Sequence, residues 1–175
     1  TALQSFVSRN VPPLESAVLT VGAVKSGTAN NIIPREAHFI GTVRTLKQSV
    51  RESAEGRFRQ IVTGAAQAMG CTAEIGWHPS YPVTHNDAAL TEEFLAMAAA
   101  RLGAERVVRV DQPTMGGEDF AYYGHHVPAC FFLIGLRPVG VTNTPLLHQA
   151  EFDFNDDALQ TGIEMMVSAA MMDSD

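Results

Sequence analysis

The chain has 175 residues and a formal net charge of −7, and 46% of its residues are hydrophobic against 18% charged. This composition supplies a packed core for one ordinary domain or two small ones, and it excludes a mostly disordered chain. An acidic chain without a basic run is a poor ligand for nucleic acid, and its longest apolar run, ACFFLIG, is too short to span a bilayer. We therefore expect neither nucleic acid nor a membrane as a partner.

The first part of the chain predicts a helix followed by two strands. Residues 1–10 place apolar side chains on one helical face and end before two prolines, which stop a helix. The runs 16–24 and 36–45 are rich in β-branched and alternating apolar residues, as strands are. In the second run, the alternation places His38 and Arg44 together on the polar face.

A long helix and a third strand are predicted next. Ser49 and Glu52 match a capping box, and the apolar positions behind them recur every three or four residues until Gly70. Residues 71–77 alternate again and predict a strand. The order helix, strand, strand, helix, strand predicts an α+β fold, a ferredoxin-like β-α-β-β-α-β unit that lacks its first strand.

The segment 78–87 combines two prolines with polar turn residues and predicts a domain boundary. Beyond it we expect a helix capped at 86–87, a short strand at 106–111 and another strand at 129–135. The unbroken apolar run of the last strand favours a parallel sheet covered on both faces, so we expect this half to be part of an α/β layer. A final helix begins at 155–156, and its apolar positions form one stripe: Leu159, Ile163, Met166 and Ala170.

The two cysteines, Cys71 and Cys130, each lie in an apolar, strand-like run. This pattern is typical of buried, reduced thiols in a cytosolic protein and not of a disulfide scaffold. We therefore expect a cytoplasmic protein.

The six histidines are the first candidates for chemistry, but no H-x-x-x-H or H-x-x-E-H metal-binding pair is present. The surroundings of His38, His78 and His85 favour solvated or structural positions, and the adjacent pair 125–126 favours a surface loop. His148 differs, because it follows a loop and precedes the last helix, where α/β domains tend to build their sites. From the residues alone it can be a ligand or an ordinary loop residue.

The segment TMGGEDFAYYGHH, residues 114–126, concentrates the most reactive side chains in the shortest stretch. Its Gly-Gly pair lets the backbone approach another group closely. Glu118 and Asp119 can serve as a general base, as metal ligands or as caps of a following helix, and the sequence leaves these roles open. No G-x-S-x-G motif or phosphate-binding glycine loop is present.

Three motifs in order carry a resemblance: NIIPREAHFIGTVRT at 31–45, MGGEDFAYY at 115–123 and PLLHQAEFDF at 145–154. Together they closely resemble the M20 metallopeptidase/amidohydrolase family, in particular its branch of hippurate hydrolases and N-acyl-L-amino acid amidohydrolases. The resemblance implies a zinc-peptidase-like α/β catalytic domain interrupted by a ferredoxin-like lid of four antiparallel strands and two helices, which commonly dimerises. It assigns residues 1–79 to an incomplete lid and 80–175 to the C-terminal part of the catalytic domain.

The resemblance also implies an activity, the hydrolysis of N-acyl amino acids by metal-activated water. Two divalent ions (zinc, manganese, cobalt or nickel) would be required, and His148 resembles one of their ligands. The family's H-A-C-G-H-D motif and its paired glutamates, which include the general base, are absent from these 175 residues. We therefore expect no catalytic base here, a chain that is the C-terminal part of a longer amidohydrolase, and negligible activity in isolation.

Five further residues resemble substrate-binding positions of the family. Asn31 and Arg44 would reach the carboxylate or the amide oxygen of the substrate from the lid. Gly116, Gly117 and Glu118 would form part of the cleft wall. The planar guanidinium of Arg44 suits a carboxylate, because the two groups match in two parallel hydrogen bonds.

Two alternatives stay open at this point. The first is a non-catalytic, ferredoxin-like oligomerisation module with an α/β appendage, in which Arg44 and Asn31 serve a protein interface. The second, a small-molecule sensing domain, accounts only for the first half of the chain and leaves the MGGEDF and PLLH motifs unexplained.

Overall fold

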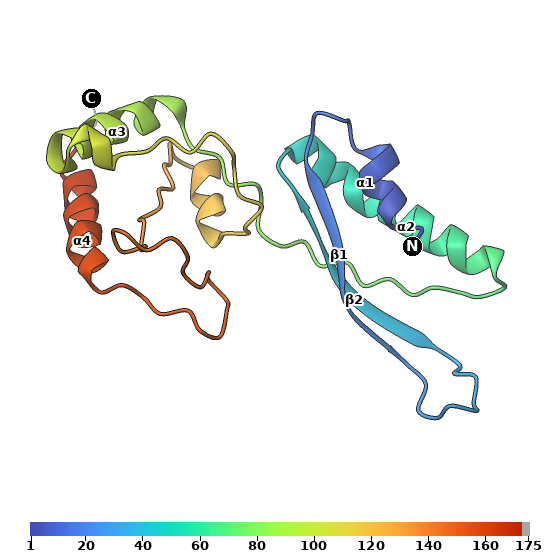
Figure 1. Cartoon of the computed structure of the whole chain (residues 1–175). Coiled ribbons are helices and arrows are strands. Elements are labelled where there is room, and N and C mark those ends of the chain that lie inside the picture. The colour runs from blue at the N-terminus through green and yellow to red at the C-terminus, as the bar shows by residue number, and fades with distance from the viewer. Residues whose placement is uncertain (173–175) are drawn as a thin grey trace. The chain divides into compact units, whose positions relative to one another are not determined.

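The computed structural model describes residues 1–172, which form two compact units (Figure 1). Unit 1 consists of residues 1–84 together with 110–122. Unit 2 consists of residues 85–109 together with the chain from residue 123 onward.

Unit 1 contains four regular elements: helix α1 (Gln4–Asn10), strands β1 (Ala17–Ser26) and β2 (Ala37–Thr45), and helix α2 (Gln48–Ala68). The two strands pair antiparallel. α1 packs on β1, α2 packs on β2, and the two helices also contact each other (Figure 1). The helix and the two strands expected in the first 45 residues are therefore present.

The core of unit 1 lies between the helices and one end of the ribbon. Phe6 is 2% exposed and packs with the buried side chains of Leu19, Val50 and Ala54. Trp77 covers this cluster from outside, and its ring centroid lies 5.3 Å from that of Phe58. Burial of several large apolar side chains against one another is what holds so short a ribbon to two helices.

A β-bulge interrupts the ribbon. Val21 pairs with Gly41 and Ala23 pairs with Ile40, so Gly22 has no partner across the ribbon. Beyond the bulge Val24 pairs with Phe39, and both lie on the same face of the ribbon as Val21 and Gly41. In a regular strand, residues 21 and 24 would lie on opposite faces, because side chains alternate; the bulge removes this difference. Beyond the bulge the ribbon extends past the helices, and Val24, Phe39 and Ile40 are exposed there (Figure 1).

Unit 2 is built on two helices, α3 (Ala88–Leu102) and α4 (Asp157–Ala170), which contact each other. A short 3₁₀ helix, η1 (Ala104–Arg106), follows α3 directly, and a second one, η2 (Asp119–His125), begins in unit 1 and ends in unit 2. Phe94, Ala98 and Met165 are buried between α3 and α4. The rings of Phe94 and Phe132 stack on the same core with centroids 4.5 Å apart.

The side chain of Asn86 ties the start of α3 to the apolar segment 129–135. Asn86 Nδ2 donates to the main-chain oxygen of Phe131 at 2.9 Å, and Phe131 N donates to Asn86 Oδ1 at 2.8 Å. Asp87 N donates to Ala129 O at 2.8 Å. A side-chain amide here makes the pair of bonds that a neighbouring strand makes in a sheet.

Three expected strands do not form. Residues 71–77, 106–111 and 129–135 are not strands in the structure, and the sheet of the described residues has two strands only. The four-stranded, ferredoxin-like lid and the parallel sheet are therefore not confirmed. A strand exists only where a second backbone completes its ladder, and an alternating or apolar run does not contain that information.

Local details of the helices also differ from expectation. α2 begins at Gln48 after Lys47, whose side chain makes no capping bond, so the capping box of Ser49 and Glu52 is wrong. Glu52 instead accepts a 3.0 Å bond from the side-chain amide of Gln48. The end of α2 agrees with expectation, because Gly70 has a φ of 69°, which glycine adopts without strain.

The expected apolar stripe of the last helix faces outward. Ile163 is 65% exposed, and Leu159 and Met166 are more than half exposed. The buried stripe of α4 contains Ala158, Met165 and Ser168 instead: Ser168 is small, and Met165 fills the core against α3. Both stripes are largely apolar, so periodicity alone does not select the inner one.

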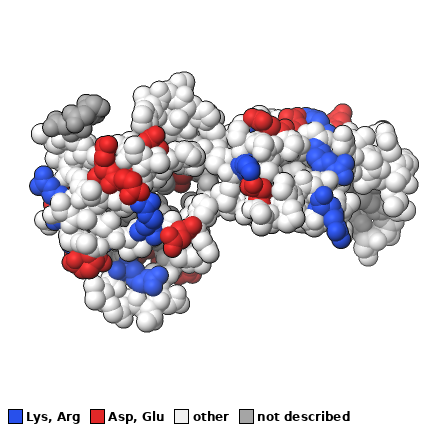
Figure 2. All heavy atoms as spheres, turned by 90° about the horizontal axis from the view of Figure 1, so that it is seen from above, with Lys and Arg blue, Asp and Glu red and all other residues white. Residues whose placement is uncertain are grey.

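Cys71 is exposed and Cys130 is half-buried, and both are free thiols. The expectation of a buried thiol is therefore wrong for Cys71, which lies just after the end of α2 and is not part of a strand. Within residues 1–172 no helix combines the length and the apolar character needed to cross a membrane. On the face shown in Figure 2, acidic and basic side chains are interspersed in both units.

Candidate functional site

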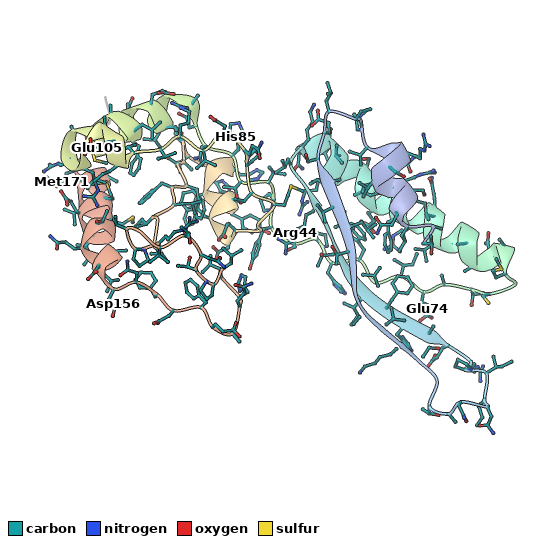
Figure 3. All side chains as sticks on the ribbon, in the orientation of Figure 1. Arg44, Glu74, His85, Glu105, Asp156 and Met171 are labelled. Carbon is teal, nitrogen blue, oxygen red and sulfur yellow. The ribbon has the colours of Figure 1, made fainter. Side chains whose placement is uncertain are left out.

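Arg44 contacts the Gly-Gly segment within unit 1. It is exposed near the end of β2, on the polar face expected for it (Figure 3). Its Nη1 donates a hydrogen bond of 2.7 Å to the main-chain oxygen of Met115, the residue before Gly116. Two segments that the sequence separates by 71 positions are thus brought together, and both contain candidate substrate-binding residues.

Gly116, Gly117 and Glu118 are all exposed in the loop that precedes η2. A Cβ built on Gly117 would lie 3.4 Å from Cδ2 of Tyr81, so the aromatic ring lies directly beside this glycine. Glu118 contributes its main-chain oxygen to the start of the 3₁₀ turn, accepting from Ala121 N at 3.2 Å.

Asn31 lies in the turn between β1 and β2, and it is exposed. Arg44 lies near the opposite end of β2. A strand rises about 3.3 Å per residue, so roughly 20 Å of ribbon separates the two side chains. A small molecule held by Arg44 does not reach Asn31 of the same protomer.

His148 lies in a turn of unit 2 and has an unusual backbone. Gln149 N donates to Leu146 O at 3.1 Å and Leu146 N donates to Gln149 Oε1 at 2.6 Å, which closes the turn around His148. Its φ is 70°, and it is the one non-glycine residue with a positive φ among residues 1–172. This region is strained for a residue with a Cβ, and such strain concentrates at functional sites.

The other histidines are exposed. Three of them line a shallow pocket in unit 2. His85, His125 and His126 line a space of about 260 Å³ beside Asp87. The Asp87 carboxylate accepts from Leu90 N at 2.9 Å as the cap of α3, as expected for this position. His38 lies 3.3 Å from Glu36 on the ribbon surface.

The His, Cys, Asp and Glu side chains of the described residues do not form a complete metal site. Within the described part of the chain, no group of three or more His, Cys, Asp or Glu side chains has the arrangement needed to hold an ion. His148 can therefore supply one ligand, and residues 1–172 do not complete a coordination sphere of three or four protein ligands.

Two residues contribute to the surroundings of the Gly-Gly segment although nothing in the sequence indicates it. Tyr81 lies in the proline-rich linker and contacts Gly117, and its ring also meets Tyr122 edge-on with centroids 6.3 Å apart. Arg51 is an ordinary polar position of α2, yet Nη2 donates to the main-chain oxygens of Ser80 and Tyr81. Only the fold reveals these contacts, because each joins segments distant in sequence.

The chain is similar to proteins of known class over almost its whole length. The model of peptidase family M20/M25/M40 matches residues 9–172. An N-acetyldiaminopimelate deacetylase of Anoxybacillus flavithermus is 38% identical over 165 residues, which are 94% of this chain and 42% of that protein. An N-acetylcysteine deacetylase of Bacillus subtilis is 34% identical over 172 residues, which are 98% of this chain and 43% of that protein.

Solved structures agree with these relatives. The YXEP protein of Bacillus subtilis, described as a dinuclear metal binding peptidase from the M20 family, superposes with a TM-score of 0.73 at 30% identity, covering 97% of this chain and 43% of that one. A putative aminohydrolase from methicillin-resistant Staphylococcus aureus gives a TM-score of 0.74 at 27% identity with the same coverage. The chain thus spans less than half the length of the proteins it matches. It belongs to peptidase family M20/M25/M40.

Proposed function

We propose that this chain is part of a metal-dependent amidohydrolase that cleaves the amide bond of N-acyl amino acids. The observation that carries the proposal is the 2.7 Å bond from Arg44 to Met115, because it joins a side chain suited to a carboxylate to the residue before the Gly-Gly pair in one unit. Membership of the M20 family and the hydrolytic names of the relatives support the same class of reaction. They disfavour the alternative of a non-catalytic oligomerisation module.

Arg44 is proposed to hold the free carboxylate of the substrate. One of its nitrogens, Nη1, already donates to Met115 O, and a guanidinium has five N–H donors in a fixed fork. The donors that remain form no further hydrogen bond or ion pair within the described residues, and they suit the two oxygens of a carboxylate. The same side chain thus fixes the loop and the substrate relative to each other.

The Gly-Gly segment is proposed to line the site beside this carboxylate. Gly116 and Gly117 have no side chains to keep a substrate away from the main chain, so their peptide groups are accessible to it. The Glu118 carboxylate is exposed and can act on polar groups of the substrate. Asn31, at the far end of the ribbon, stays a prediction from the resemblance.

His148 is proposed to be a metal ligand. Its left-handed backbone supports this role, because a strained histidine in a turn is retained where its direction is needed. Residues 1–172 do not complete a set of ligands, so the proposal takes the remaining ligands, and with them the general base, from outside these residues. The two ions and their identity, whether zinc, manganese, cobalt or nickel, belong to this proposal.

The substrate class proposed is an N-acyl amino acid with a free carboxylate. Two of the relatives are named as deacetylases of N-acetylated amino acids, which favours N-acetyl amino acids as the substrates. Hippurate, which carries a benzoyl group in the same place, is the second candidate. The carboxylate is common to both, so Arg44 has the same role with either.

The organisation of the protein is proposed to follow the resemblance. Residues 1–79 form the lid part, residues 80–175 belong to the catalytic domain, and the protein is a cytoplasmic homodimer through the lid. The exposed apolar side chains of Val24, Phe39 and Ile40 on the ribbon support an interface on this part of the chain. Mass measurement of the protein in solution by light scattering tests the dimer.

The decisive experiment compares this polypeptide with the protein purified natively from its source. Intact mass, metal content and hydrolysis of N-acetyl amino acids and hippurate are measured for both. We expect two divalent ions per chain and turnover in the native protein, and negligible turnover by residues 1–175 alone. A native protein without bound metal and without amidase activity would contradict the proposal, as would hippurate turnover by the isolated chain.

A further inference from the structure

The Gly-Gly segment is stiffened by its neighbours and not by its own sequence. Two consecutive glycines lose more backbone freedom on ordering than any other pair. In unit 1 the segment is held by Arg44 at the carbonyl of Met115. The ring of Tyr81 meets it two residues later, 3.4 Å from where a Cβ of Gly117 would stand. The position of this ring therefore limits the positions open to Gly117.

Tyr81 itself is not buried, so packing alone does not fix its ring. It is 46% exposed, and its ring meets that of Tyr122, also about half exposed, at a centroid distance of 6.3 Å and an interplanar angle of 81°. Edge-on pairs of this kind contribute only modestly to stability. An additional constraint must act through the backbone of Tyr81.

Arg51 supplies that constraint from helix α2. Its Nη2 donates to the main-chain oxygen of Ser80 and, at 3.2 Å, to that of Tyr81. The carbonyls of Ser80 and Tyr81 belong to the peptide groups on either side of the Tyr81 α-carbon, so holding both restricts the φ and ψ of Tyr81 and the direction in which its side chain leaves the backbone. The half-buried Arg51 side chain is anchored on a 21-residue helix, the longest element of unit 1.

We propose that Arg51 is a positioning residue for Gly117, acting through Tyr81. This rests on the proposed function, in which the Gly116–Gly117 backbone lines the substrate site. Arg51 orients the Tyr81 ring, and the ring restricts Gly117, while Arg44 holds the other end of the segment at Met115. The substrate then meets a backbone that is already ordered, and binding does not have to order it.

The test uses nuclear magnetic resonance of the whole chain without substrate, so it is independent of whether the amidohydrolase activity exists. The protons of Gly117 lie beside an aromatic ring, and their chemical shifts report the position of that ring. Tyr81→Ala removes the ring and defines the shift of an uncovered Gly117, whereas Tyr81→Phe keeps it. We expect Arg51→Met to move the Gly117 resonances toward their position in Tyr81→Ala, and Arg51→Lys to move them less.

Backbone order gives the second readout. We expect the order parameters of Gly116 and Gly117 to fall from near 0.85, typical of rigid backbone, to below about 0.6 in Arg51→Met. In the double variant Arg51→Met with Tyr81→Ala, no change beyond that of Tyr81→Ala is expected, because both act on one path.

The matched control is Arg57→Met. Arg57 lies on the same helix and donates to Gln60 Oε1 at 3.1 Å, a contact within the helix. We expect it to leave both glycines unchanged. The proposal is overturned if Arg51→Met leaves the Gly117 resonances in place while Tyr81→Ala moves them, if Arg57→Met moves them equally, or if the two changes in the double variant add. Absence of amidase activity in the native protein would instead refute only the proposed function.

Discussion

Arg44 Nη1 and the main-chain oxygen of Met115 form a 2.7 Å hydrogen bond that joins the end of β2 to the Gly-Gly loop. The end of β2 supplies a cationic side chain and the Gly-Gly loop supplies a flexible backbone. The hydrogen bond places these two features side by side. A site for a molecule that carries a carboxylate and an amide needs both features, the first for charge and the second for close approach.

Replacing Arg44 by methionine is expected to raise the KM of the active protein for N-acyl amino acids by about 10- to 100-fold, because a charge-assisted pair to a carboxylate is lost. An analogue of the substrate in which an uncharged carboxamide replaces the free carboxylate provides the check. The KM for this analogue should change little. Steady-state kinetics with the two substrates measures the difference. Arg35→Met, in the exposed hairpin turn, is the matched control and should leave both values unchanged. Equal losses for acid and amide would show that Arg44 does not read the carboxylate.

The φ of 70° at His148 leads to a prediction about stability. His148→Gly and His148→Ala both remove the imidazole, but only glycine adopts this backbone without strain. We expect the glycine variant to be more stable than the alanine variant by about 1 kcal/mol. Urea unfolding of the two proteins measures this difference. Both variants should lose metal in the native protein, and retention of the full metal content by either would exclude His148 as a ligand.

Gly41 is expected to tolerate no side chain. A Cβ there would lie 2.2 Å from the main-chain oxygen of Thr20 across the ribbon, a distance that real contacts do not reach. Gly41→Ala should therefore destabilise the protein by about 1–3 kcal/mol, as overpacking does. Gly56→Ala, with nothing within 4 Å of its Cβ on the exposed side of α2, should stabilise it by about 0.5–1 kcal/mol. Thermal unfolding of this pair distinguishes a steric effect from a general effect of glycine replacement; changes of the same sign would contradict the prediction.

Asn86→Ala is expected to destabilise unit 2 by about 2 kcal/mol, since it removes two hydrogen bonds to the main chain of Phe131. Asn86→Asp should be at least as harmful, because it replaces the donating amide by a carboxylate beside a carbonyl oxygen. Asn143→Ala, at an exposed position, should change the stability by less than about 0.5 kcal/mol. Denaturant unfolding followed at unit 2 measures all three. A harmless Asn86→Asp would show that the amide donor contributes nothing.

The sequence predicts those parts of the fold that depend on nearby residues. The start of α3 follows from Asp87, whose carboxylate accepts from Leu90 N three residues later. The end of α2 follows from Gly70. Local patterns can also compete: the capping box of Ser49 and Glu52 is wrong, because Glu52 instead accepts from the side-chain amide of Gln48.

The parts that depend on distant residues are not contained in local patterns. The apolar run 129–135 has strand composition, but its identity as a strand depends on a neighbour, and here the side chain of Asn86 takes that position at Phe131. The polar face of β2 predicts the direction of Arg44 but not its partner Met115. Likewise, no local pattern around Arg51 or Tyr81 predicts the hydrogen bond between them.

The unpaired Gly22 has a consequence for engineering the ribbon. It shifts the count of β1 by one, so that Val24 lies on the side of Val21 and opposite Phe39. Deleting Gly22 would leave Val21, Ala23 and Val24 in regular alternation opposite Gly41, Ile40 and Phe39, so the outer hairpin would lose its bulge and keep its two faces. A deletion inside the regular strand β2 would instead exchange the faces beyond it, so redesign of this surface can shorten β1 at the bulge but has to keep the length of β2.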